Sequence, residues 1–311
     1  MKTKKFLLVM FVVLALFAGS AYAEKDIESL RARAEQGNAK AQNDLGVCYH
    51  NGDGVEKNFA EAVKWYLKAA EQNYAKAFDN LGSIYQFGGY GVEKNLPKAL
   101  EYFRKGAEAG VPRSMNQIGY FYEYGLGGLE KSNANAFEWY SKGAEKGNRY
   151  SQYNLGRFFL LGIVTAKDYS KAVKYLTKAA EQEHSGAMNE LGNMYLEGRG
   201  VRVNYKKAVE LFMKAADLGN VMAQNNLGVM YARGKYVQKN LRKAFNYYKM
   251  AANQGDKVAQ YNVGAMYEYG NGVQKDTKKA REWYEKSAAQ DYEDATRALK
   301  RLEAKKGPKN L

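Results

Sequence analysis

The chain has 311 residues and a single cysteine, which excludes a disulfide framework within one molecule. Its 48 Lys and Arg outnumber 33 Asp and Glu, and such a basic balance favours acidic partners such as a protein, an anionic lipid or an envelope polymer. No run of five or more like charges occurs, so a nucleic-acid partner is not expected.

The first 23 residues, MKTKKFLLVMFVVLALFAGSAYA, have the pattern of a secretory signal. A lysine-rich start precedes an apolar run from Phe6 to Phe17, and small residues stand at Ala21 and Ala23. The run is shorter than the roughly 20 apolar residues that cross a bilayer. We therefore expect cleavage after Ala23 and export to the periplasm or out of the cell. The mature chain then has no transmembrane segment and carries 45 basic against 33 acidic residues, a formal charge of +12.

Residues 24–38 follow the signal and include DIESLRARAEQGN, which reads as a lone helix. From residue 39 to residue 292, one sequence pattern is then repeated seven times. A glycine, usually preceded by leucine, recurs every 36 or 37 residues. These glycines are Gly46, Gly82, Gly119, Gly156, Gly192, Gly228 and Gly264. A period of this size indicates stacked units that bury their cores against their neighbours, with residues 24–38 as an N-terminal capping helix.

Each unit begins with an amphipathic helix, in which Leu45, Cys48 and Tyr49 of the first unit share one apolar face because they are spaced i, i+3 and i+4. An aromatic residue stands three positions after every glycine, and we expect its ring in the core. These residues are Tyr49, Tyr85, Tyr122, Phe159, Tyr195, Tyr231 and Tyr267.

A glycine-containing loop, NGDGVEKN in the first unit, leads to a second helix. The loop ends on a residue whose side chain can cap the N-terminus of that helix. The seven predicted caps are Asn58, Asn95, Ser132, Asp168, Asn204, Asn240 and Asp276.

The second helix carries alanines around two large residues, as in Ala62, Trp65 and Tyr66. It is expected to end where the backbone turns left-handed, which Gly and Asn adopt readily. The predicted end positions are Asn73, Gly110, Gly147, Glu183, Gly219, Gly255 and Asp291.

Residues 293–311 place Ala295, Leu299 and Leu302 on one side of a last helix and charged residues on the other, as a C-terminal capping helix with a short tail requires. The sequence therefore predicts an all-α fold. Its architecture is an α/α superhelical solenoid of seven helix-loop-helix repeats with half-repeat caps.

The L-G-x-x-Y motif, the G-x-G loop and the A-x-x-W/Y-Y/F-x-K-A-A helix resemble Sel-1-like repeats, which are relatives of tetratricopeptide repeats. The resemblance covers roughly four fifths of the chain. It implies a scaffold or adaptor that binds a protein or peptide partner, and the basic net charge favours an acidic one. A monomer or weak homo-oligomer is expected.

One branch of this family, the cysteine-rich secreted bacterial proteins, has been labelled as penicillin-binding or β-lactamase-like. A hydrolase of cell-wall or β-lactam substrates is therefore an alternative, but the chain lacks the paired cysteines of that branch and no serine has lysine three residues later. A binder of anionic envelope polymer is the other alternative. We expect that the protein is not an enzyme.

No residue pattern predicts a catalytic set, a metal site or a cofactor site. Cys48 occupies a position that is apolar in the other repeats, so we expect it to be a buried small hydrophobe. His50 and His184 lie at unlike places in different repeats, and the G-x-G loops follow helices and lack the P-loop lysine.

A partner is expected on the face of the first helices that points away from the repeat core, starting three residues before each glycine. In the related tetratricopeptide arrangement, these helices line a concave groove. Tyr and Arg there supply anchors, and Asn can bond to an extended peptide. The predicted partner-binding residues are Asn116, Tyr120, Tyr124, Tyr153, Arg157, Leu160, Asn189 and Asn193. Alternatively, the Asn side chains bind neighbouring loops and only hold the superhelix together.

The fourth repeat departs most from the pattern. Its loop, LLGIVTAKD, lacks the second glycine, and Leu160, Leu161, Ile163 and Val164 make this stretch more apolar than the corresponding loops of the other repeats. This change favours a contact with a partner or a second copy, although the loop folding over a neighbouring helix would also explain it.

Overall fold

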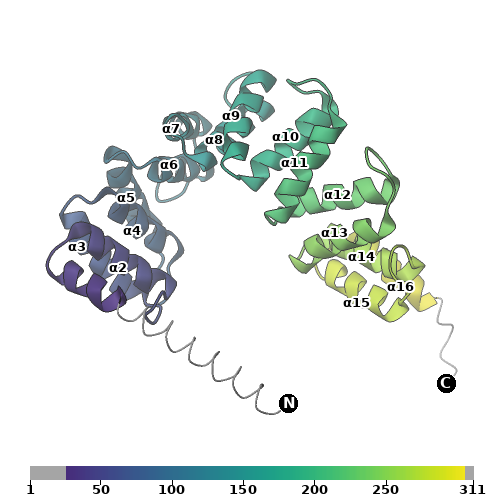
Figure 1. Cartoon of the computed structure of the whole chain (residues 1–311), viewed down its shortest axis with the longest axis horizontal. Helices are drawn as coiled ribbons and strands as arrows, with labels where there is room; N and C mark the ends of the chain where they lie inside the picture. Colours follow the sequence, from purple (N-terminus) through teal and green to yellow (C-terminus); the bar gives the residue numbers. More distant parts are fainter. Residues whose placement is uncertain (1–25, 305–311) are drawn as a thin grey trace, which may run out of the picture. The chain divides into compact units, whose positions relative to one another are not determined.

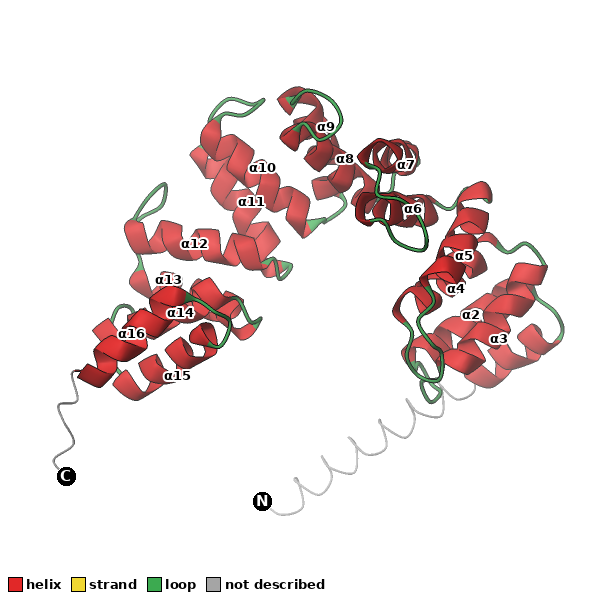
Figure 2. Cartoon of the chain, turned by 180° about the vertical axis from the view of Figure 1, so that it is seen from behind, coloured by secondary structure: helices red, strands yellow, loops and turns green. Residues whose placement is uncertain are grey.

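The computed structural model describes residues 26–304. Within this part of the chain a helix at residues 26–35 precedes fifteen further helices, and no strand forms apart from one isolated bridge between Gly89 and Val92 (Figure 2). The predicted all-α class is therefore confirmed. The predicted signal at residues 1–23 and the last residues of the predicted tail lie outside the described residues.

The helices alternate between the two kinds that each repeat contains. The first helices are α2 (Ala39–Asn51), α4 (Ala75–Phe87), α6 (Pro112–Tyr124), α8 (Arg149–Leu161), α10 (Ser185–Glu197), α12 (Val221–Arg233), α14 (Lys257–Tyr269) and, after the last repeat, α16 (Glu293–Ala304). The second helices are α3 (Phe59–Glu71), α5 (Leu96–Glu108), α7 (Asn133–Glu145), α9 (Tyr169–Glu181), α11 (Tyr205–Asp217), α13 (Leu241–Asn253) and α15 (Thr277–Ala288). None of the described helices is both long and apolar enough to span a membrane.

Figure 1 labels the helices along the chain. They belong to two compact units, the first ending at Ser151 and the second beginning at Gln152. In unit 1 the pairs α2 with α3, α4 with α5 and α6 with α7 pack closely, and α3 and α5 also pack on the first helix of the next repeat. In unit 2 the same arrangement joins α10 to α11, α12 to α13 and α14 to α15, and α16 closes the series against α15.

Side-chain caps begin every second helix, as predicted. The Asn58 side chain accepts a hydrogen bond from the backbone N of Glu61 at 3.0 Å, and the six other predicted caps make the equivalent bond. Each cap satisfies an amide that the helix itself leaves unpaired. The left-handed residue after each second helix is also confirmed, even at Asn73, Glu183 and Asp291, whose φ angles are 57° to 59°.

The glycine of the L-G pair lies against the ring or chain of the second large residue in the following helix. A Cβ added to any of the seven glycines would come within 2.5 to 2.8 Å of that side chain. The facing side chains are Tyr66, Phe103, Tyr140, Leu176, Phe212, Tyr248 and Tyr284, and all are buried. The glycine is therefore required for the two helices of a repeat to approach each other.

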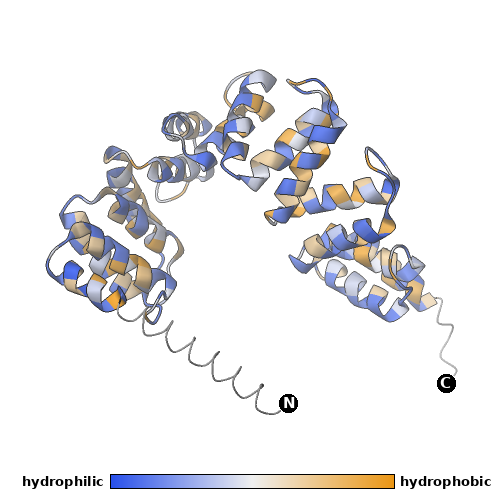
Figure 3. Cartoon of the chain, viewed as in Figure 1, coloured by the Kyte–Doolittle hydropathy of each residue, from blue (hydrophilic) through white to orange (hydrophobic). Residues whose placement is uncertain are grey.

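The expected burial of the aromatic residue three positions after each glycine is wrong for most repeats. Phe159 and Tyr231 are buried, but the other five, including Tyr195, are half-buried. The two buried rings and the half-buried Tyr85 ring stack flat on the first large aromatic residue of the second helix, with 5.7 Å between the centroids of Tyr85 and Tyr102. The position therefore lies at the border of the core. Figure 3 shows that hydrophilic and hydrophobic residues are interspersed along the helices.

Candidate interaction surface

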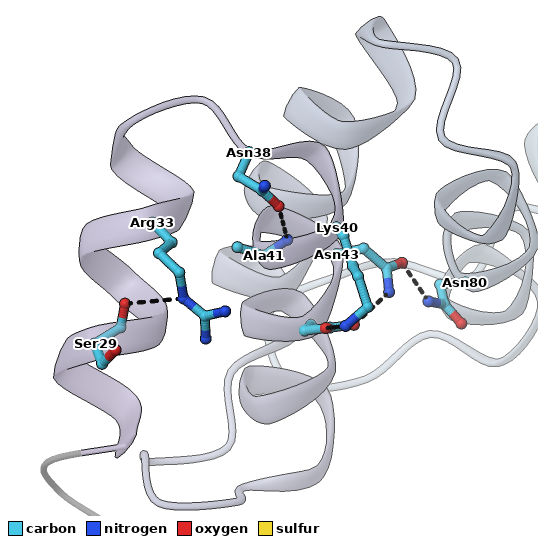
Figure 4. A network of polar contacts seen from close by, with 8 residues as sticks. Ser29, Arg33, Asn38, Lys40, Ala41, Asn43 and Asn80 are labelled. Atoms are coloured by element: carbon cyan, nitrogen blue, oxygen red, sulfur yellow. Dashed lines mark hydrogen bonds and ion pairs between the residues drawn. The ribbon is translucent and has the colours of Figure 1, made fainter.

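The polar residues predicted on the outer face of the first helices are largely buried and join consecutive repeats. Asn80 of α4 donates to Asn43 of α2 at 2.9 Å, as Figure 4 shows. Asn226 of α12 donates likewise to Asn189 of α10 at 3.1 Å. The alternative interpretation, in which these amides hold neighbouring repeats together, fits these contacts.

The predicted outward orientation is therefore wrong for Asn116 and Asn189. Asn116 accepts a hydrogen bond from the Ser151 hydroxyl and is buried, as is Asn189. Leu160 is buried as well. These three residues can position their neighbours but offer little surface to a partner.

Carboxylates on the same helices are held in the same way. Asp79 is buried in unit 1, where the Ser114 hydroxyl donates to it at 2.8 Å and the Arg113 guanidinium lies 3.2 Å away. Burial raises the pKa of Asp79, and Arg113 and Ser114 oppose that rise. In unit 2, Glu268 accepts from the Tyr284 hydroxyl and from Arg301. These contacts are structural, since both carboxylates have their partners inside the repeat stack.

Exposed aromatic residues form the clearest surface feature of unit 1. Phe87 is 71% exposed at the end of α4, and Tyr124 is 54% exposed at the end of α6, which packs beside α4. Both stand five positions after the glycine of their repeat, and the Tyr120 ring lies 4.6 Å from that of Tyr124. We call Phe87, Tyr120 and Tyr124 the aromatic row. Exposed rings on rigid helices can supply contact area at little cost in entropy.

Unit 2 contains the remaining predicted residues. The Tyr153 ring stacks on His184 with 4.4 Å between centroids, and His184 in turn caps α10 by accepting from the amide of Ala187. Arg157 and Asn193 are half-exposed. The loop of the fourth repeat leaves Leu161 and Val164 exposed, at 52% and 41%. This solvent exposure leaves them accessible to a partner.

No arrangement among the described residues supports catalysis or metal binding. Cys48 is half-buried rather than buried, because the repeat before it is a single helix, and burial raises the pKa of its thiol. Burial lowers the pKa of His50. No three His, Cys, Asp or Glu side chains of residues 26–304 are grouped so that they could hold a metal ion.

Phe87 was not among the predicted partner-binding residues, although the sequence carries a signal for it. The position five residues after the repeat glycine lies outside the apolar face of the helix. It is polar in three repeats and large in the other four, which hold Phe87, Tyr124, Leu161 and Tyr269. A large apolar residue at this position cannot be explained by packing within the repeat. Comparing the repeats position by position would have identified it.

The chain matches the family model described as Sel1 repeat at residues 39–74, 79–111, 112–148, 149–184, 185–220, 221–256 and 257–292. Among solved structures, a Sel1 repeat protein from Oxalobacter formigenes is 31% identical with a TM-score of 0.70, over 91% of this chain and 81% of that one. A protective antigen present in uropathogenic Escherichia coli strains is 30% identical with a TM-score of 0.53, over 91% of this chain and 68% of that one.

Curated relatives match over shorter segments. The ERAD-associated E3 ubiquitin-protein ligase component HRD3A of Arabidopsis thaliana is 36% identical over 66 residues, which are 21% of this chain and 10% of that protein. The matches span about a tenth of the length of the curated relatives. Because seven consecutive matches to the family model extend from residue 39 to residue 292, the chain belongs to the Sel1 repeat family, whose members generally mediate protein–protein interactions on a fold that is typically not enzymatic.

Proposed function

We propose that this protein is an exported scaffold that holds a protein or peptide partner against the first helices of its repeats. The observation that carries the proposal is the aromatic row of unit 1, in which large rings are exposed on two neighbouring first helices. Such rings dominate the binding energy of many protein interfaces. Of the residues predicted from the sequence, Tyr120 and Tyr124 keep their proposed role, and Phe87 joins them.

Arg157, Tyr153 and Asn193 are proposed as further contacts of unit 2, together with the exposed Leu161. The Tyr153 ring already stacks on His184 in this unit. Export rests on the signal pattern of residues 1–23, and we propose that residues 24–38 and 293–311 cap the two ends of the repeats.

The proposal is tested by affinity capture from the native host with a Phe87→Ser/Tyr124→Ser variant. Both side chains are exposed, so the variant should keep the wild-type helix content and melting temperature and yet lose the partner that the wild type retains. Tyr90→Ser is the matched control, because Tyr90 is 59% exposed in the loop before α5, off the first helices. Equal capture by all three proteins would show that the partner binds elsewhere.

A further inference from the structure

Positive charge is unevenly distributed along the described chain. Residues 26–151 contain 16 Lys and Arg and 16 Asp and Glu, whereas residues 152–304 contain 25 basic and 16 acidic residues. The whole excess, a formal charge of +9, therefore belongs to unit 2. Charge asymmetry between two parts of one chain indicates a charged partner for the basic part.

Most of this excess lies on the second helices of unit 2. Together α9, α11, α13 and α15 carry 13 basic and 5 acidic residues, a formal charge of +8. The first-helix residues of the same unit carry six of each sign, and so do the second helices of unit 1. The charge is therefore not a property of the repeat itself.

We call the lysines of these four helices the lysine face. Its members are Lys171, Lys174, Lys178, Lys206, Lys207, Lys214, Lys243, Lys249, Lys278, Lys279 and Lys286. All but Lys249 are exposed. Ion pairs of Lys171, Lys279 and Arg281 with Asp168, Asp276 and Glu303 offset part of the charge of the four helices. Subtracting these three acids still leaves +5.

Lysines of neighbouring helices are crowded at one point of this face. The Nζ atoms of Lys249 on α13 and Lys286 on α15 lie 4.1 and 4.4 Å from the centroid of the Trp283 ring. Burial, followed by the charges of Lys286 and Lys279, lowers the pKa of Lys249. A negative partner would relieve this repulsion.

An apolar slot opens beside the lysines of α11. It is a cavity of about 190 Å³ between α9, α10 and α11, and its lining includes Leu191, Tyr195 and Leu211 together with two lysines, Lys207 and Lys214, and one acid, Glu181. Ligand pockets for whole small molecules usually exceed about 300 Å³. The slot is therefore suited to one apolar side chain with negative charges on either side of it.

We propose that the lysine face binds an acidic polypeptide segment that inserts one apolar side chain into this slot. A second copy of the chain does not fit, since unit 1 has no net charge and unit 2 is basic. Among the described residues, the four helices expose two large side chains that are apolar or aromatic, Tyr205 and Met250. A helix that binds a membrane surface inserts an apolar face into it, so a membrane is not the expected ligand. This inference rests on the proposed function, in which the partner is a protein or peptide, but it does not involve the aromatic row.

The test measures binding of the full chain to a fluorescent peptide of glutamates with one central leucine, by anisotropy, from about 50 mM NaCl upward. Lys178→Gln/Lys214→Gln/Lys243→Gln/Lys279→Gln removes one charge from each second helix. It should weaken binding by at least about tenfold and flatten the salt dependence. Replacing the leucine by glutamate should also weaken binding by about tenfold.

The matched control is Lys76→Gln/Lys94→Gln/Lys131→Gln/Lys146→Gln, which makes the same change in net charge at exposed lysines of unit 1. It should bind like the wild type. Equal weakening in both variants, no binding at the lowest salt, or no effect of the leucine would overturn the proposal. Tighter binding to polygalacturonate, to vesicles containing phosphatidylglycerol or to duplex DNA would overturn it in favour of that ligand. Failure here leaves the capture test of the aromatic row unaffected.

Discussion

Gly228 of α12 lies directly beneath the ring of Tyr248 in α13, and a Cβ at position 228 would come within 2.5 Å of the ring atoms Cδ1 and Cε1. Tyr248 is buried. The two helices of this repeat can therefore pack at their observed separation only if position 228 has no side chain. The same relationship recurs in all seven repeats, with Leu176 in place of the ring in the fourth.

Gly228→Ala should destabilise the protein, because the added methyl group must displace a packed ring. We expect the free energy of unfolding to fall by about 1–2 kcal/mol, because the cost of overpacking exceeds the gain from the higher helix propensity of alanine. Urea unfolding followed by circular dichroism measures the loss. In a Tyr248→Ala background the same change should cost clearly less, and an equal cost in both backgrounds would show that the ring is not what excludes the methyl group.

The two aromatic positions of the fifth repeat should differ in their contribution to stability. Phe212 is fully buried against Gly192, whereas Tyr195 is half-buried. Phe212→Ala should cost about 3–5 kcal/mol of unfolding free energy, and Tyr195→Ala about half of that or less. The measurement is again urea unfolding of the two variants. A larger loss for Tyr195→Ala than for Phe212→Ala would contradict the assignment of Phe212 to the core and Tyr195 to its border.

Glutamine pairs link consecutive repeats and can be exchanged as pairs. Gln254 donates to Gln224 at 2.9 Å, while the equivalent positions one repeat earlier hold Leu218 and Met188. Gln224→Met alone should cost about 1–2 kcal/mol, because it removes the acceptor of Gln254 and the bond to the Ala216 carbonyl.

Adding Gln254→Leu to Gln224→Met should recover at least half of that loss, since both positions then match the natural apolar pair. Thermal melting of the two single variants and the double variant tests this coupling. Additive losses in the double variant would mean that the two positions are independent.

Arg113 should stabilise the protein in a pH-dependent way. Burial raises the pKa of Asp79, and the positive charge of the Arg113 guanidinium opposes that rise. Arg113→Met would therefore raise the pKa of Asp79 further. When a carboxyl group has a higher pKa in the folded state than in the unfolded state, the folded protein loses stability as the pH rises through the folded-state pKa. The variant should therefore cost about 1–2 kcal/mol near pH 7 and less near pH 4.

Urea unfolding at both pH values provides this comparison, with Arg104→Met of the exposed Arg104 as control. The control should show no loss that depends on pH. A cost for Arg113→Met that stays constant or grows toward low pH would contradict the role given to Asp79.

The sequence predicted the repeat and its boundaries well because they depend on local chemistry. Asn58 caps a helix and Asn73 ends one through contacts within a few residues, and seven copies repeat the signal. The direction in which Asn116 and Asn189 face depends instead on the next helix, since the atoms that cover them lie 35 and 37 residues away. A single helix face cannot show this.

The candidate surface was predicted only in part for the same reason. Tyr120 and Tyr124 were identified from residue type, while Leu160 was placed on the surface although α8 buries it. The excess of basic residues was visible in the composition. Its concentration on the second helices of unit 2 emerges only when the helices are assigned to their repeats. Longer-range packing decides which of the repeated positions remain free to bind.

Site-specific photo-crosslinking in the native host tests the central claim most directly. A photoreactive phenylalanine analogue is placed, in separate proteins, at the positions of Phe87, Tyr124 and the control Tyr90. If the aromatic row holds a partner, positions 87 and 124 give the same crosslinked protein after irradiation and position 90 gives none. Crosslinks from position 90 alone, or no crosslinks from positions 87 and 124, would contradict the account.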